Sequence, residues 1–331
     1  LDRLLLIIVC GYLLWYSPTA SHFRIEHFIY AQTITLFITA TVAFLIVYKQ
    51  LKYLRFRFQP AFLWLILKDS YPYALVIFLM TIYSRIDAIM IEQLLTDGKT
   101  EAALYASAYR LLEASNMIGF LFASLLLPIF ARMLKAREPL EDLVYFSWQM
   151  IWAGAITLAI SVYFFRVEIM QLLYSSGSAY SGDILGYLML SFVAVTGSYI
   201  FGTLLTANGN VRQLNIIAFV TVAVNVIFNY FFILHAHALG AAQVTCITQF
   251  FALLAQLFFV KKIFDLQIKT SVLIRLGLFT LFVYLGSLLH ADMKYLAWQG
   301  RFLINILVAS GAAFGLQLID IGGVIKMLKE R

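Results

Sequence analysis

The chain has 331 residues, of which 63% are hydrophobic and 12% are charged, and its formal net charge is +7. Soluble domains are apolar over about half of their residues, so this composition excludes a soluble globular protein. The apolar runs are long and continuous, whereas the strands of a transmembrane barrel show alternating segments of about ten residues. We therefore predict an all-α polytopic membrane protein.

Ten apolar segments are candidate membrane-spanning helices, although the first is short for a full crossing. Their predicted ranges are 4–17, 28–48, 71–95, 105–131, 144–165, 184–206, 214–234, 241–260, 272–289 and 302–320. Most Lys and Arg residues fall in one set of alternate loops, which the positive-inside rule places in the cytoplasm. Both ends of the chain are then cytoplasmic. Because the chain begins at Leu1 and opens almost directly in an apolar run, we expect it to be part of a longer protein.

The basic excess lies in short loops beside the bilayer, where anionic lipids attract it, so the lipid bilayer is an expected partner and nucleic acid is not. The two cysteines, Cys10 and Cys246, lie in distant apolar segments and support neither a disulfide framework nor a metal cluster. The loop histidines, such as His235 and His237, lack the neighbours of a typical metal motif. No nucleophile motif or phosphate-binding glycine loop is present. We expect no metal, no cofactor and no enzyme activity.

The connection from Lys49 to Ser70 contains the basic and aromatic run KQLKYLRFRF, followed by PAFLWLILKDS. Proline is common at the first position of a helix, and the apolar residues after Pro60 are too few to cross a bilayer. We predict a short interfacial helix here, within a linker over 51–70 that separates two helical lobes.

Charged residues occur inside two of the predicted spans. The third span carries Arg85 and Asp87, and the fourth carries Arg110 and Glu113. A charge at the centre of a span costs at least ~2.5 kcal/mol on insertion scales, so such charges usually face a partner or water. If the two spans form a hairpin about Gly98, Asp87 comes level with Arg110, and Arg85 with Glu113. The four charges are then expected to meet at one depth.

Helix geometry limits how these charges can pair. At about 100° per residue, Arg85 and Asp87 point to nearly opposite faces, whereas Arg110 and Glu113 share one face. Both pairs cannot be ideal at once, so we expect one pair to join the hairpin and the other members to face a polar cavity. Glu92 lies on the face of Arg85 and would extend its polar stripe. The alternative is two structural ion pairs buried between helices, without a ligand.

The seventh predicted span has a second polar face, formed by Asn225 and Asn229. Counted from the loop near Ala238, Asn229 comes level with Thr248 and Gln249 of the eighth span. We favour hydrogen bonds between these two spans, because such pairs are common in membrane bundles. Contact with a substrate is the alternative.

Several stretches carry a family resemblance. Residues 83–95 read YSRIDAIMIEQLL, and residues 102–133 read AALYASAYRLLEASNMIGFLFASLLLPIFARM. Further stretches are LLYSSGSAYSGDILGYLMLS (172–191), GTLLTANGNVRQLNIIAFVTVAVNVIFNYFFI (202–233) and ALGAAQVTCITQF (238–250). As an ordered set they resemble the polysaccharide (O-antigen type) flippases of the multidrug/oligosaccharidyl-lipid/polysaccharide exporter superfamily.

The resemblance implies a two-lobed transporter. In that family, fourteen helices form two six-helix lobes and a trailing pair, and both termini are cytoplasmic. Our ten spans would be helices five to fourteen. The implied division is 1–50 for the last two helices of the N-terminal lobe, 51–70 for the cytoplasmic inter-lobe linker with its interfacial helix, 71–265 for the six-helix C-terminal lobe, and 266–331 for the two trailing helices and a cytoplasmic tail.

The resemblance also implies a function. A flippase of this kind moves an isoprenoid-linked oligosaccharide, here an undecaprenyl-pyrophosphate repeat unit, from the inner to the outer leaflet of a bacterial plasma membrane for surface polysaccharide or lipopolysaccharide O-antigen. By position, Arg85 and Arg110 would bind or steer the pyrophosphate, because arginine forks suit it. Asp87 and Glu113 would tune the arginines or exchange a coupling cation, a proton or a sodium ion. The alternatives are a drug/cation antiporter of the same superfamily and a membrane glycosyltransferase or polysaccharide polymerase.

Overall fold

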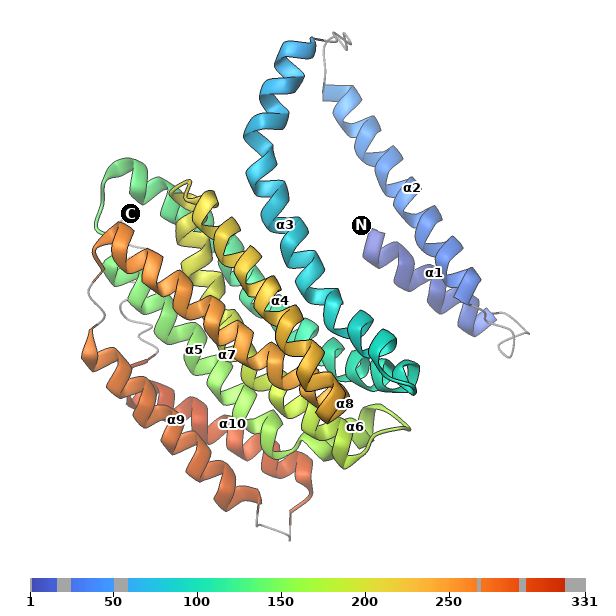
Figure 1. Ribbon diagram of the computed structural model, residues 1–331, viewed down its shortest axis with the longest axis vertical. Helices are drawn as coiled ribbons and strands as arrows, with labels where there is room; N and C mark the ends of the chain where they lie inside the picture. Colours follow the sequence, from blue (N-terminus) through green and yellow to red (C-terminus); the bar gives the residue numbers. More distant parts are fainter. Residues whose placement is uncertain (1, 17–24, 51–58, 267–268, 292–295, 319–331) are drawn as a thin grey trace. The chain divides into compact units, whose positions relative to one another are not determined.

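The computed structural model describes residues 2–16, 25–50, 59–266, 269–291 and 296–318, and in these ranges it contains helices and no strand (Figure 1). The helices are α1 (Asp2–Tyr16), α2 (Ile25–Gln50), α3 (Pro60–Leu94), α4 (Gly98–Ala136), α5 (Glu141–Phe164), α6 (Arg166–Leu173), α7 (Ala179–Ala207), α8 (Val211–Phe264), α9 (Thr270–Ala291) and α10 (Trp298–Gly315).

Seven of the described helices are long and apolar enough to cross a membrane. One of them, α8, has 54 residues and contains both the seventh and the eighth predicted spans. The first and last predicted spans correspond to α1, with 15 residues, and α10, with 18 residues. The prediction of an all-α, multi-pass membrane protein is confirmed.

The chain divides into two compact units, Leu1–Ile66 and Leu67–Arg331. In the first unit α1 packs against α2. The second unit contains most of α3 and all the helices from α4 to α10. The division falls inside the predicted linker, of which residues 51–58 lie outside the described part. The assignment of the two units to two lobes stays a prediction.

Helix α3 begins at Pro60, a position that suits proline. It then continues without a break through Pro72 to Leu94, so the predicted interfacial segment and the third predicted span form one helix of 35 residues. At Pro72 the helix is tied to α8, because the side-chain amide of Asn215 donates a hydrogen bond of 2.8 Å to the Pro72 carbonyl oxygen.

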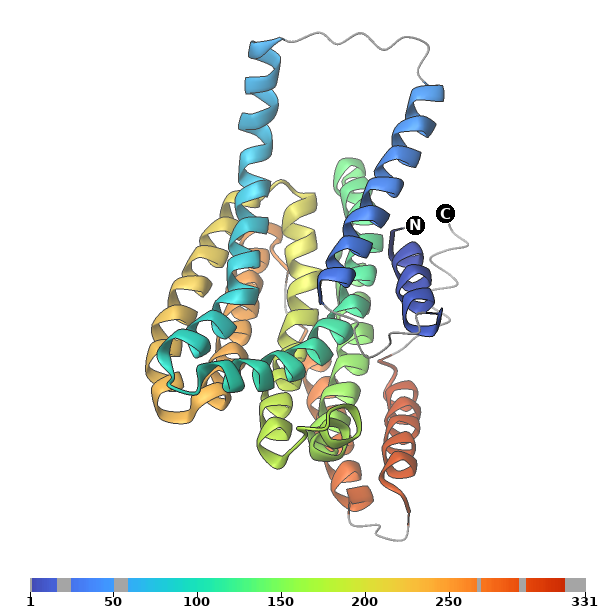
Figure 2. The same ribbon diagram turned by 90° about the vertical axis from the view of Figure 1, so that its right-hand side faces the viewer.

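Helix α7 is the central helix of the second unit. It packs against α4, α5, α6 and α8, and the two views in Figures 1 and 2 show it surrounded by them. Leu185, Leu188 and Ile200 of this helix are completely buried. The pair formed by α9 and α10 packs against α5, so the two predicted trailing helices belong to the same unit.

Helix α8 folds back on itself. At His237 the backbone adopts φ 56° and ψ −137°, which interrupts the helix, and the halves on either side run alongside each other (Figures 1 and 2). Gly240 permits this turn, because a Cβ atom there would overlap the backbone carbonyl oxygen of Phe232. The reversal lies next to the predicted loop near Ala238 and separates the seventh and eighth predicted spans.

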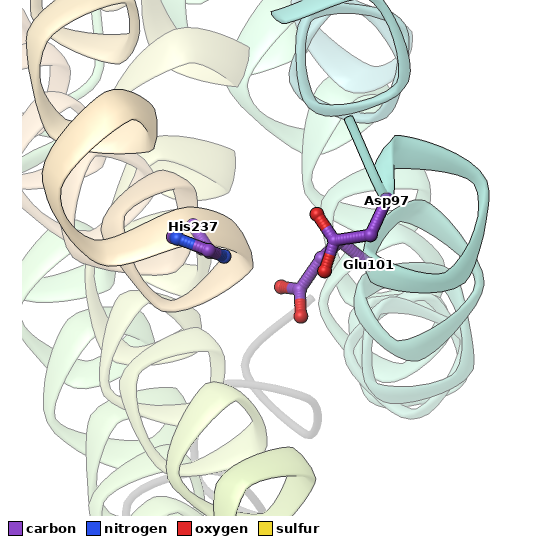
Figure 3. A group of neighbouring side chains, drawn as sticks. All are labelled: Asp97, Glu101 and His237. Carbon is purple, nitrogen blue, oxygen red and sulfur yellow. The ribbon is translucent and has the colours of Figure 1, made fainter. Parts of the chain in front are cut away.

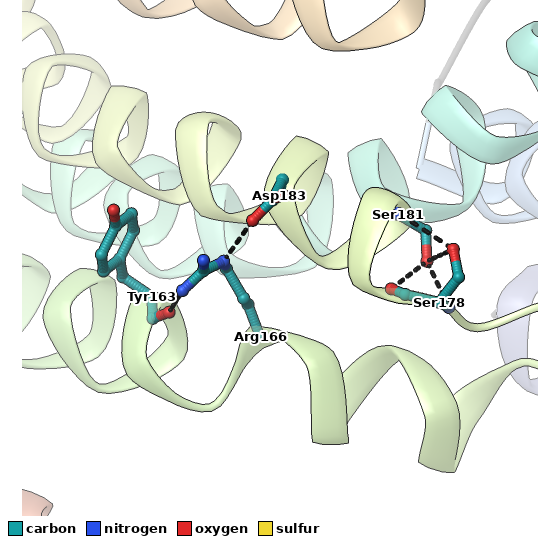
Figure 4. A network of polar contacts seen from close by, with 5 residues as sticks. All are labelled: Tyr163, Arg166, Ser178, Ser181 and Asp183. Atoms are coloured by element: carbon teal, nitrogen blue, oxygen red, sulfur yellow. Dashed lines mark hydrogen bonds and ion pairs between the residues drawn. The ribbon is translucent and has the colours of Figure 1, made fainter. Parts of the chain in front are cut away.

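A polar network fixes the connection from α5 through α6 to α7 (Figure 4). Arg166 donates from Nε to Oδ1 of Asp183 and from Nη1 to the carbonyl oxygen of Tyr163, each at 2.8 Å. Ser178 and Ser181 form a capping box at the start of α7. These bonds satisfy the backbone and charged groups at the end of α5 and the start of α7. The role of this network is therefore structural.

Gly240→Ala is expected to destabilise the protein by about 1–3 kcal/mol, the usual range for overpacking. The added methyl group would push the Phe232 carbonyl aside and separate the two halves of α8. Thermal unfolding of the purified protein in detergent measures the loss as a lower midpoint. Gly277→Ala in α9 is the control, because nothing lies within 4 Å of the Cβ position there. Equal midpoints for the two variants would contradict the close approach at Gly240.

Candidate functional site

Helix α3 contributes one narrow buried stripe to the second unit. Its buried residues are Leu79, Tyr83, Asp87 and Ile91. They recur every four residues and therefore lie on one face of the helix. Asp87 is only 2% exposed, so its carboxylate lies inside the bundle and not on the bundle surface.

The Asp87 carboxylate accepts three short hydrogen bonds. The hydroxyls of Tyr105 and Thr245 both donate to Oδ2 at 2.6 Å, and Nδ2 of Asn229 donates to Oδ1 at 2.6 Å. Tyr105 belongs to α4. Asn229 and Thr245 belong to the two halves of α8 and lie equally far in sequence from His237. Within the described ranges no lysine or arginine forms an ion pair with Asp87. The carboxylate therefore joins three helical segments to α3 through neutral donors.

Further polar contacts surround these donors. The Tyr83 hydroxyl shares a hydrogen bond of 2.8 Å with Oγ1 of Thr248, and Nδ2 of Asn229 also donates to Oδ1 of Asn225 at 3.0 Å. Two buried atoms of this network, Nδ2 of Asn225 and Oδ1 of Asn229, have no hydrogen-bond partner among the described residues. The site thus keeps unused polar atoms beside a buried carboxylate.

The oxygen atoms of this network suit a hard cation. Hard cations take carboxylate, amide and hydroxyl oxygens as ligands, and Asp87, Asn225, Asn229 and Thr245 supply all three types. A carboxylate buried without a positive partner is costly, because neutral donors restore only part of its hydration. A sodium ion or a proton would neutralise it.

Arg85 and Glu113 form an ion pair that joins α3 to α4. Nη2 of Arg85 lies 3.5 Å from Oε1 of Glu113, and the two side chains are 68% and 44% exposed. This is one of the two pairs expected across the hairpin. Because both side chains lie on the surface of the second unit, they need contact with water, a polar ligand or protein rather than with lipid.

The second expected pair, between Asp87 and Arg110, does not form. Arg110 is exposed, whereas Asp87 is turned into the bundle and bound by neutral donors. Arg85 and Asp87 lie about 200° apart around α3, so the ion pair of Arg85 with Glu113 directs Asp87 to the opposite side. Glu92 is also exposed. The role of these five residues in a substrate cavity stays a prediction.

The predicted partners of Asn229 also differ from the structure. Asn229 bonds to Asp87 of α3 instead of Thr248, and Thr248 bonds to Tyr83 of α3. The sequence pattern therefore identifies polar residues of α8 but not the helix that they face. Tyr83 and Tyr105 are absent from the predicted site residues. The four-residue spacing of Tyr83 and Asp87 is the signal that would have placed the tyrosine beside the carboxylate.

A separate cluster lies at the break in α8. Asp97, Glu101 and His237 each offer one potential ligand atom, and these atoms lie within 4.8 Å of one another (Figure 3). Oε2 of Glu101 accepts hydrogen bonds from the Tyr180 hydroxyl at 2.6 Å and from the backbone N–H of Ala238 at 3.0 Å. A carboxylate at the start of a helix is favourable, so Glu101 stabilises the second half of α8 where it begins. These bonds give Glu101 a structural role. The side chains of Asp97 and His237 are exposed beside it.

Comparison with solved structures gives a likeness of the fold. No protein-family model matches the chain, and no curated protein matches its sequence. Among solved structures, the chain is similar to the lipid II flippase MurJ in its inward closed conformation, with a TM-score of 0.68 and 17% sequence identity. The match covers 98% of this chain and 66% of the MurJ chain. The chain therefore shares its fold with part of that flippase, and it spans 66% of the MurJ chain.

Tyr105→Phe is expected to lower the free energy of unfolding by about 1.5–3 kcal/mol, because it removes a hydrogen bond to a buried charged group. Tyr109→Phe is the matched control, since Tyr109 stacks on Tyr105 with ring centroids 5.7 Å apart and makes no bond to Asp87. Unfolding of the purified protein in detergent measures both. In an Asp87→Asn background the cost of Tyr105→Phe should shrink, because the two changes act on one contact. Equal stability of the two Phe variants would refute this role of Tyr105.

Proposed function

We propose that this chain is part of a flippase that moves a lipid-linked oligosaccharide across a membrane. The fold supports the proposal, because the structural neighbour is a lipid II flippase. The observation that carries it is the exposed ion pair of Arg85 and Glu113 within two helices that are long and apolar enough to span a membrane. Charges at such positions are costly against lipid, so they favour a surface that faces water and a polar substrate.

The chemistry of this surface suits a pyrophosphate head group. Arginine binds phosphate oxygens through two parallel N–H donors, and Arg85 and Arg110 both expose their side chains. The 3.5 Å separation of Arg85 and Glu113 is longer than the ~2.7–2.9 Å of a strong charge-assisted hydrogen bond. Glu113 would therefore orient Arg85 while leaving guanidinium donors for the substrate. Glu92 would extend the polar surface along α3.

The proposed substrate is an isoprenoid-linked oligosaccharide, specifically an undecaprenyl-pyrophosphate repeat unit. Its lipid tail would remain in the hydrocarbon while the pyrophosphate and sugars cross from the inner to the outer leaflet of a bacterial plasma membrane. The product would enter surface polysaccharide, such as the O-antigen of lipopolysaccharide. The resemblance of residues 83–95 and 102–133 to O-antigen type flippases supports this substrate, and the activity requires no enzyme chemistry.

The proposed architecture has two lobes that rock about the substrate. Residues 1–50 would end the N-terminal lobe, 51–70 would link the lobes in the cytoplasm, 71–265 would form the C-terminal lobe, and 266–331 would form the trailing pair and tail. Further helices of the N-terminal lobe would complete the passage. Both ends of this chain would be cytoplasmic, and rocking of the lobes would give alternating access.

Asp87 is the proposed site of the coupling cation, a proton or a sodium ion. Its buried position and oxygen-rich surroundings support this assignment. Because Arg85 lies on the opposite face of α3, the cation and the substrate would occupy separate sites on one helix. A change of charge at Asp87 would alter how firmly α3 is held to α4 and α8, and so would change the position of Arg85.

Arg85→Ala and Arg110→Ala in the full-length protein are each expected to abolish surface polysaccharide while protein levels stay normal, because each change removes a phosphate-binding group from the passage. Gel analysis of polysaccharide from cells that depend on the variant measures the effect. Lys135→Ala is the control, since Lys135 is an exposed cation in the last turn of α4.

Wild-type polysaccharide from both arginine variants would refute the proposed passage. Normal polysaccharide together with loss of drug export would favour the antiporter of the same superfamily.

Asp87→Asn is expected to lower transport at least tenfold and to remove its dependence on a proton or sodium gradient, because the amide keeps the shape but not the charge of the side chain. Flipping in proteoliposomes with imposed gradients measures both effects. Glu138→Gln, which changes an exposed carboxylate beyond the end of α4, is the control. Unaltered gradient dependence in Asp87→Asn would exclude this carboxylate as the coupling site.

A further inference from the structure

A cavity of about 230 Å³ adjoins the Asp87 network, and its walls come from α3, α4, α7 and both halves of α8. Thr245 and Gln256 both line it, and they lie on one half of α8, where a rise of 1.5 Å per residue separates them by about 16 Å. The first half of α8 contributes Leu214 at the end near Gln256. The cavity is therefore elongated along the helices, with one end at the Asp87 network.

Four polar atoms, each on a residue that lines this cavity, are buried and have no hydrogen-bond partner in the part of the chain that the structure describes. They are Oδ1 of Asn116, Oγ of Ser198, Oγ1 of Thr221 and Oε1 of Gln256. Thr221 is 6% exposed and Gln256 is 4% exposed, so neither reaches bulk solvent through the surface of the unit. A buried polar atom without a partner costs about 1–3 kcal/mol. Because these atoms are buried, each would reach the cavity only by rotation of its side chain, and the cavity would then offer four polar groups to an occupant.

The size of the cavity agrees with this. One water molecule needs roughly 10–15 Å³ of such space and two to four polar partners, and this cavity is many times larger. With their side chains turned toward the cavity, Asn116, Ser198, Thr221 and Gln256 would bond to a row of water molecules. Such a row would connect the far end of the cavity to Thr245, which also binds Asp87 directly.

Tyr83 stands between the cavity and the carboxylate. It lines the cavity, it lies one helical turn from Asp87 on the buried stripe of α3, and its hydroxyl is held by Thr248 at 2.8 Å. Rotation of this ring away from Thr248 would open the carboxylate to the cavity. Tyr83 thus has the position of a gate, beside Thr245, which lines the cavity and binds Asp87.

We propose that this cavity is a hydrated route by which a monovalent cation, a sodium ion or a proton, reaches Asp87 from the cytoplasmic side, with Tyr83 as the gate. The direction follows from the end at Leu214 and Gln256, which lies toward the two ends of α8 that the predicted topology places inside. The inference rests on the proposed function, because it supplies a path for the coupling cation of that flippase.

Cysteine accessibility tests the route without reference to transport. The full-length protein is prepared with Cys10, Cys246 and any other native cysteine replaced by alanine, and Ser198→Cys or Thr221→Cys is added. Ag⁺, a small monovalent cation that binds thiols, is applied to inside-out vesicles. We expect both cysteines to react at least tenfold faster than Ser191→Cys, which is completely buried on α7 and bonded to the Leu188 carbonyl away from the cavity.

The second measurement removes the polar atoms while nearly keeping the shape. Thr221→Val and Gln256→Leu delete oxygens that have no protein partner, so folding should be unaffected. We expect each to slow gradient-driven flipping in proteoliposomes at least fivefold, because the row of waters is interrupted.

The outcomes separate this inference from the proposed function. Thiols as unreactive as Ser191→Cys, reaction from the outer side alone, or unchanged flipping by Thr221→Val and Gln256→Leu would overturn the route while Asp87 could still be the coupling site. Retained gradient dependence in Asp87→Asn would refute the coupling role even if the cavity reacts with Ag⁺.

Discussion

The burial of one carboxylate constrains the whole second unit. Asp87 is buried, and it takes its hydrogen bonds from donors on α4 and on both halves of α8. These bonds hold α3 in place, since that helix buries only a narrow stripe of its own surface. A ligand that changes the charge at Asp87 would therefore change how this helix is held.

The two faces of α3 have different proposed roles. One face presents Arg85 and its partner Glu113 to the surface, and the other presents Asp87 to the interior. Coupling between a cation and a substrate then needs no long chain of contacts, because both sites belong to one rigid helix. The cavity beside Tyr83 is the proposed access to the inner site.

The sequence predicts much of this fold because apolar length and charge placement follow from the bilayer alone. It locates most of the helices, the turn at Gly98 and the reversal near Ala238, and it identifies Asp87 as one of four charges inside the predicted spans. It does not predict which neutral residues face that carboxylate. The rotation of α3 about its axis is decided by packing, and the polar side chains of α8 could have paired with each other as well as with α3. Tyr105 gives no signal in the sequence, because tyrosines are common in such helices.

The reversal of α8 at His237 fixes the number of residues between the turn and each donor to Asp87. Asn229 and Thr245 reach the same carboxylate because the chain between them is folded at its midpoint. Inserting or deleting a residue on one side would rotate that half of the hairpin by about 100° and take its donor away from Asp87. Surface connections usually tolerate such changes. At this turn, by contrast, an insertion or deletion would remove a hydrogen bond from the buried carboxylate.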